Sequence, residues 1–162
     1  MRSLALPLLA LTALAAPLAA KDSLGVFSDW GAFRDPSVPR CYAIAEAAPS
    51  RLQRDFRPYM TVASWPARRI RGQVHFRMSR ELREGARVTL RIARRNYPMV
   101  GGKADAWARD PSTDAAILAA IRSADSMTIF ATDRRGRRFS NTYALVGAAS
   151  AIDAATLACA RR

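Results

Sequence analysis

The chain has 162 residues and a formal net charge of +13 at pH 7, from 26 basic and 13 acidic residues. This length predicts one domain, and no apolar stretch after the first twenty residues is long enough to span a membrane. The charge is uneven, because residues 51–95 carry thirteen basic and three acidic groups, a net charge of +10. Arginine supplies nearly all of it. Arginine favours a surface for phosphate or carboxylate groups, although a GC-rich genome would also enrich arginine and alanine.

The first twenty residues have the organisation of a secretory signal. Arg2 is followed by an uncharged apolar run from Leu4 to Leu18, and then by Ala19 and Ala20. We expect cleavage after Ala20, which leaves residues 21–162 as a single domain that is periplasmic or secreted, with no transmembrane span. An uncleaved N-terminal anchor is the alternative.

The mature region is dominated by short apolar or alternating segments separated by turn residues, which predicts strands. The expected strands cover residues 26–33, 40–45, 59–65, 73–78, 87–92, 127–131 and 139–145. Two helices are expected, one beginning at Asp110-Pro111 and one after Gly147. The predicted fold is mainly β, an antiparallel β-sandwich or barrel-like domain with two short α-helices packed on it.

Residues 73–78 and 87–92 show the clearest alternation, with one apolar and one polar face each. Glu84-Gly85 between them is a plausible hairpin connection. If the two segments pair, His75 and several arginines share one solvent-exposed face, and neighbouring arginines extend it. The resulting anion-binding candidates are Arg68, Arg69, Arg71, Arg77, Arg87, Arg91, Arg94 and Arg95.

Cys41 and Cys159 are the only cysteines. An even number of cysteines in an exported chain predicts a disulfide, here between the second strand and the C-terminal helix. Two buried free thiols are the alternative. Neither cysteine has the C-x-x-C spacing of a redox pair.

Several fragments together resemble the invasion-associated locus B family of bacterial envelope proteins. They are the opening 24–30 followed by Cys41-Tyr42, the central 73–92 region with Ala106-Trp107, and the segment 136–147 with an alanine-rich helix ending on Cys159. The resemblance implies an exported, mostly β protein that is not known as an enzyme; some members are linked to bacterial entry into host cells. The residues that carry this frame are Trp30, Cys41, Trp107, Tyr143 and Cys159.

No catalytic or metal-binding constellation is recognisable. His75 is the only histidine, nearby arginines disfavour a metal there, and the serines lack a nucleophile-elbow context. Gly101-Gly102-Lys103 predicts a turn rather than a phosphate loop. Trp30, Trp65 and Trp107 could form a binding platform, but we expect at least two of them in the core. We therefore expect no catalytic residue, metal or cofactor.

The sequence favours a non-enzymatic binding module whose basic face meets an anionic envelope component or an acidic protein. Export argues against nucleic acid as the main partner. The alternative is a periplasmic inhibitor or chaperone-like protein that binds one protein partner through a concave or aromatic patch. An unrecognised hydrolase is the third hypothesis.

Overall fold

The computed structural model describes residues 20–160. The predicted signal therefore lies outside the described residues apart from Ala20. The elements in chain order are β1 (Asp22–Phe27), β2 (Trp30–Asp35), β3 (Arg40–Glu46), β4 (Tyr59–Trp65), η1 (Pro66–Arg68), β5 (Ile70–Arg77), β6 (Val88–Ile92), β7 (Arg95–Gly102), β8 (Asp105–Ala108), α1 (Pro111–Ile121), β9 (Ser126–Thr132), β10 (Arg138–Ala144) and α2 (Ala148–Ala160). None of the helices in this described part is long and apolar enough to cross a membrane.

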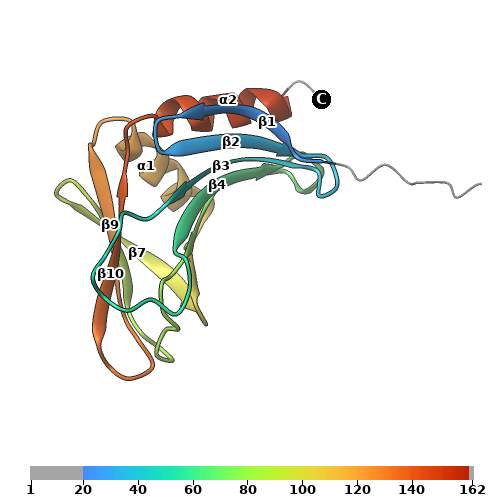
Figure 1. Cartoon of the computed structure of the whole chain (residues 1–162). Coiled ribbons are helices and arrows are strands. Elements are labelled where there is room, and N and C mark those ends of the chain that lie inside the picture. Colours follow the sequence, from blue (N-terminus) through green and yellow to red (C-terminus); the bar gives the residue numbers. More distant parts are fainter. Residues whose placement is uncertain (1–19, 161–162) are drawn as a thin grey trace, which may run out of the picture.

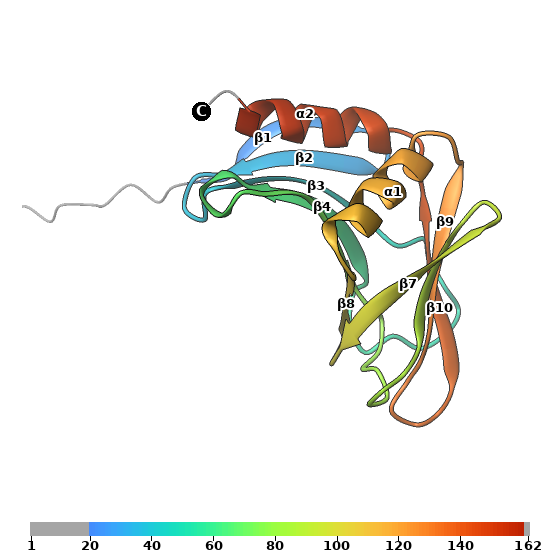
Figure 2. The same ribbon diagram turned by 180° about the vertical axis from the view of Figure 1, so that it is seen from behind.

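The strands form one sheet in the order β1-β2-β3-β4-β5-β8-β7-β6-β9-β10, and every neighbouring pair is antiparallel. The sheet bends sharply, so that β1–β4 form an arch under α2 while β7–β10 run steeply away from it (Figures 1 and 2). β1 and β10 lie at the two ends and do not pair with each other, so the sheet is open and sandwich-like. The predicted mainly β class with two helices is confirmed.

The core lies on the face of the sheet that is turned toward α2. Trp30 of β2 is fully buried, and its Nε1 donates to the carbonyl oxygen of Ala144 on β10 at 2.9 Å. Phe76 of β5 meets Tyr143 of β10 edge-to-face, with ring centroids 5.6 Å apart. The Trp30 contact joins strands near opposite ends of the sheet, and the Phe76 contact joins a central strand to the last one, so both hold the sheet in its curled form.

α2 lies over β1–β4 and contacts all four strands. Its buried side is made mostly of alanines, and β3 presents small residues toward it, including Ala43 and Ala45. Small side chains on both surfaces let the helix backbone approach the sheet closely. Gly147, which precedes α2, has a φ of +84°, and a Cβ there would collide with the backbone oxygen of Phe27 on β1.

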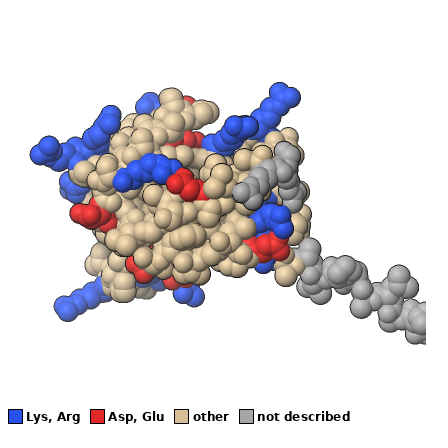
Figure 3. All heavy atoms as spheres, turned by 90° about the horizontal axis from the view of Figure 1, so that it is seen from above, with Lys and Arg blue, Asp and Glu red and all other residues tan. Residues whose placement is uncertain are grey.

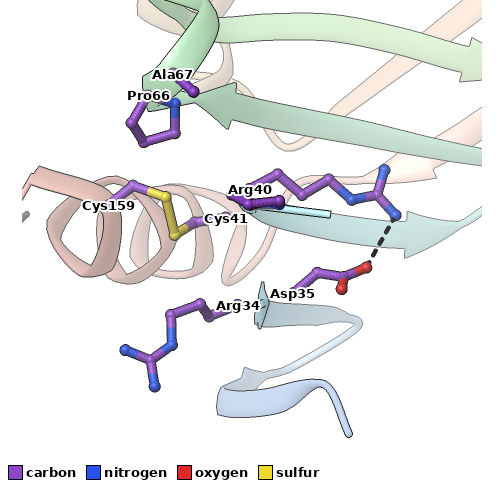
Figure 4. Close-up of a pocket in the computed structure, with 8 residues that line it drawn as sticks. Arg34, Asp35, Arg40, Cys41, Pro66, Ala67 and Cys159 are labelled. Carbon is purple, nitrogen blue, oxygen red and sulfur yellow. Dashed lines mark ion pairs between the residues drawn. A yellow bond between two sulfur atoms is a disulfide. The ribbon is translucent and has the colours of Figure 1, made fainter. Parts of the chain in front are cut away.

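The predicted disulfide is confirmed. Cys41 of β3 and Cys159 in the last turn of α2 are bonded, 118 residues apart in sequence. Figure 4 shows the bond beside Pro66 and Ala67, at the margin of a small cavity of about 200 Å³. The bond fixes the end of α2 against the sheet.

α1 begins as its sequence predicts and packs against β5, β6 and β8. Asp110 caps the helix: its carboxylate accepts from the hydroxyl of Ser112 and from the backbone N–H of Thr113, both at 2.7 Å. These hydrogen bonds, first that of Ser112, lower the pKa of Asp110 to about 2. One turn later, the carboxylate of buried Asp114 accepts a hydrogen bond from the backbone N–H of Val74 at 2.8 Å. This bond gives the Val74 N–H an acceptor just beyond the last pair of β5 with β8, which is His75 with Trp107. Burial raises the pKa of Asp114.

Three sequence predictions need correction. The expected single strand 26–33 is a hairpin, because Ser28 takes a φ of +53° and Phe27 pairs directly with Trp30. The segments 73–78 and 87–92 do not pair with each other, because β8 and β7 lie between β5 and β6. The region 95–108 contains two strands that had not been predicted, joined at Lys103 by the turn expected there.

The two edge strands, β1 and β10, differ in how their outer edges are arranged. Beside β10, the backbone N–H of Ala48, from the segment after β3, donates to the carbonyl oxygen of Thr142 at 2.8 Å. β1 is six residues long and has a bulge between Ser23 and Gly25.

Candidate binding site

The outer face of the sheet, turned away from α2, carries a hollow of about 410 Å³ over β3, β4, β5 and β8. We call it the aromatic hollow. It forms because strand alternation that buries Met60, Val62 and Val74 sends the residues between them outward. Its lining residues are Lys21, Arg40, Tyr42, Ile44, Tyr59, Thr61, Trp65, Gln73, His75 and Trp107.

Strand register places the rings of the hollow next to one another. His75 is the cross-strand partner of Thr61 on one side and of Trp107 on the other. Its ring centroid lies 5.2 Å from that of Trp107 and 6.0 Å from that of Tyr59. These three side chains are only partly buried. The result is a row of ring faces and edges open to solvent, with polar groups of Thr61 and Gln73 beside it.

An ion-pair network anchors one end of the row. The Nε2 atom of His75 lies 3.0 Å from one carboxylate oxygen of Asp105, and the Arg77 guanidinium donates to the other at 2.7 Å. Arg77 also lies over the ring of Phe56, 4.4 Å from its centroid. Asp105 therefore fixes both the imidazole and the guanidinium on the outer face.

The hydrolase hypothesis requires a nucleophile within hydrogen-bond reach of a base, for which His75 is the only histidine in the sequence. Within residues 20–160, the only polar side-chain partner of His75 is Asp105. The same residues contain no group of three or more His, Cys, Asp or Glu side chains arranged to hold a metal ion.

The opposite end of the aromatic hollow is positive. The Arg40 guanidinium lies over the Tyr42 ring at 4.7 Å from its centroid and 3.6 Å from a carboxylate oxygen of Asp35. A hydrogen bond from the hydroxyl of Ser37 holds the pKa of Asp35 below its ordinary value, with smaller contributions from Arg40 and Lys21. Asp35 is buried, whereas Arg40 lines the hollow and keeps 32% of its side-chain surface exposed.

The segment after Trp65 contains three more arginines. Arg68 ends η1, Arg69 follows it and Arg71 lies at the start of β5, and we call residues 66–71 the arginine turn. All three side chains are exposed, and none forms an ion pair or a side-chain hydrogen bond with another described residue. Pro66 and Ala67 of the same turn share the cavity beside the disulfide with Arg40, which places the turn next to that residue (Figure 4).

The eight predicted anion-binding arginines do not form one continuous face. The arginine turn and the β6–β7 turn with Arg94 and Arg95 project at opposite sides of the molecule in both Figures 1 and 2. Arg77 is held by Asp105, and Arg91 covers the Phe130 ring at 4.6 Å on another part of the sheet. Exposed Arg87 precedes β6. On the face that carries α2, basic side chains also stand around the periphery, and most of the centre is uncharged (Figure 3).

The sequence predicts at least two of the three tryptophans in the core, and this prediction is wrong. Trp30 is in the core, but Trp65 and Trp107 both line the aromatic hollow, so only one of the three is a core residue. The alternation of 59–65 contains the signal for Trp65, because burying Met60 and Val62 leaves Tyr59, Thr61 and Trp65 on the outer side. Trp107 had no such signal, because its strand had not been recognised.

Of the five residues that carry the family resemblance, four are internal: Trp30 and Tyr143 lie in the core, and Cys41 and Cys159 form the disulfide. Only Trp107 belongs to the hollow. Comparison of the chain with models of known families, with curated proteins and with solved structures found no match.

Proposed function

We propose that this chain is an exported, non-enzymatic envelope protein, resembling the invasion-associated locus B family, that binds an anionic envelope component. The observation that carries the proposal is that Lys21, Arg40 and Trp65 line one end of the aromatic hollow, and that the arginine turn follows Trp65 directly in the chain. Partly exposed aromatic rings beside guanidinium groups without acidic partners suit a ligand that has both an apolar face and an anionic group.

Export to the periplasm or the cell exterior is supported by two features. One is the signal-like segment 1–20, and the other is the disulfide, because disulfides persist in oxidising compartments. Mass analysis of the protein purified from the envelope fraction tests this part. We expect a chain that begins at Lys21; retention of residues 1–20 would contradict it.

The binding part is tested by co-sedimentation with the organism's own envelope material at about 50 mM and about 500 mM salt. We expect retention at low salt and loss at high salt, because exposed charge pairs are screened. The variant R68Q/R69Q/R71Q should lose most of this retention. The variant R87Q/R94Q/R95Q removes the same number of charges elsewhere and should keep it. Retention that is insensitive to both salt and the first variant would refute electrostatic recognition at this end.

A specific protein partner is the second candidate, as for an inhibitor or chaperone-like protein. The partly exposed rings of Tyr59 and Trp107 favour it, because aromatic residues are enriched at protein interfaces. Such a partner would tolerate charge reversal at Arg77 and Arg91 and high salt, and it would be captured as a defined protein in the same experiment.

A further inference from the structure

The aromatic hollow must recognise its ligand through side chains alone. β3, β4, β5 and β8 are interior strands, each flanked by a partner on both sides. Their backbone groups are therefore already committed to the sheet, and a partner chain cannot bind there by adding a strand. The ligand must instead suit a surface of ring faces with scattered polar groups.

That surface is amphipathic on a fine scale. The partly exposed rings of Tyr59, His75 and Trp107 share the hollow with Trp65, and Thr61 and Gln73 also line it. Tyr42 contributes only an edge, because its ring is buried between Phe33 and Arg40. A wholly apolar ligand would bury the hydroxyl and amide groups without partners, which is unfavourable. A sugar ring avoids this cost, because its C–H face can pack on an aromatic face while its hydroxyls bond the polar groups.

The two ends of the aromatic hollow differ in charge. At one end both nearby acids are compensated, Asp105 by Arg77 and Glu46 by Arg57. At the other end Lys21 and Arg40 line the hollow beside Trp65, and the arginine turn that follows Trp65 adds three cations without partners among the described residues. Guanidinium groups bind carboxylate and phosphate in bidentate geometry. The ligand should therefore carry its anionic group at the arginine turn.

Resting on the proposed function, we infer that the ligand is an acidic oligosaccharide, whose sugar rings stack along the aromatic hollow and whose carboxylate or phosphate groups meet the arginine turn. From Tyr59 to Trp65 the strand rises roughly 20 Å. This length corresponds to a few sugar units rather than one. A lipid bilayer surface or an acidic peptide would use the cations but not the row of rings.

Titration of the purified protein with hexagalacturonate, uncharged cellohexaose and hexaglutamate tests the inference. Tryptophan fluorescence and calorimetry give the readout, because Trp65 and Trp107 lie in the hollow while Trp30 is buried. We expect hexagalacturonate to bind most tightly and to change the fluorescence. Cellohexaose should bind at least about tenfold more weakly for lack of charge, and hexaglutamate similarly for lack of rings.

Variants separate the two parts of the site. W107A, or W65A if W107A fails to fold by circular dichroism, should weaken hexagalacturonate binding about tenfold, and so should R68Q/R69Q/R71Q. R87Q/R94Q/R95Q should change it less than about twofold. Equal binding of hexaglutamate and hexagalacturonate, unaffected by the tryptophan variants, would overturn the glycan assignment and leave the electrostatic function standing. Absence of hexagalacturonate binding would also overturn it. Failure of the unaltered protein to co-sediment with envelope material at low salt would count against the proposed function itself.

Discussion

Reduction of the Cys41–Cys159 disulfide should destabilise the protein strongly. The bond closes a loop of 118 residues. In the chain-entropy treatment, a cross-link over this separation removes enough freedom from the unfolded chain to stabilise the fold by about 5 kcal/mol at 25 °C. At about 4 °C for each kcal/mol in a domain of this size, the melting temperature should fall by roughly 20 °C.

Guanidinium unfolding of the oxidised and the fully reduced protein, followed by far-ultraviolet circular dichroism, measures the difference directly. The oxidised chain should also show the smaller dependence on denaturant, because its cross-linked unfolded state stays more compact and exposes less surface. The variant C41A/C159A should unfold near the midpoint of the reduced protein and should not respond to reductant. This variant separates loss of the cross-link from any other effect of the reagent.

A stability difference below about 2 kcal/mol between the oxidised and reduced proteins would refute this reasoning. It would mean that the unfolded chain already keeps its two ends close together, or that the bond strains the fold enough to cancel its benefit. An unchanged denaturant dependence accompanied by a large stability loss would point to a native-state effect instead.

Three further outcomes are expected. G147A should lower the melting temperature more than G136A does. Both glycines have a positive φ, which costs an alanine about 1–3 kcal/mol, but only a Cβ at residue 147 would collide with backbone, that of Phe27 on β1. Equal losses would contradict the close approach of the start of α2 to β1. D114A should cost about 1–3 kcal/mol in urea unfolding by leaving the Val74 N–H without an acceptor, whereas D114N keeps an oxygen and should cost less; the reverse order would be inconsistent with this hydrogen bond. The pKa of Asp110 is lowered to about 2, so its stabilising contribution should be full above about pH 4 and lost as the pH falls toward 2; D110N should flatten this part of the stability–pH curve, and an unchanged curve would contradict it.

Local chemistry made much of the fold predictable. The strand 59–65 and the start of α1 follow from alternation and from the Asp110-Pro111 cap, and both occur where they were expected. The disulfide followed from cysteine count and from the signal-like leader. These features depend on residues close together in sequence or on a choice with only one possible partner.

Pairing between distant strands was not predictable in the same way. The segments 73–78 and 87–92 look like a hairpin, yet β7 and β8 separate them, because 95–108 folds back and inserts its two strands between β5 and β6. The strand at Asp105–Ala108 has only four residues, too few for alternation to reveal it. Because Trp107 lies on this strand, the aromatic hollow could not be predicted from the sequence. The single arginine face was predicted on the assumption that 73–78 pairs with 87–92, and it is absent because those segments are not neighbours.

The treatment of the sheet ends has a consequence for how the protein behaves at high concentration. A free strand edge acts as a template on which a second copy can grow, and this route leads to fibrils. Here Ala48 occupies part of the β10 edge, and the bulge in β1 interrupts a flat run of backbone groups at the other end. Edge-to-edge pairing of two copies is thus hindered at both ends of the sheet. The chain can therefore expose aromatic residues on the face of its sheet without a free edge strand on which a second copy could readily add.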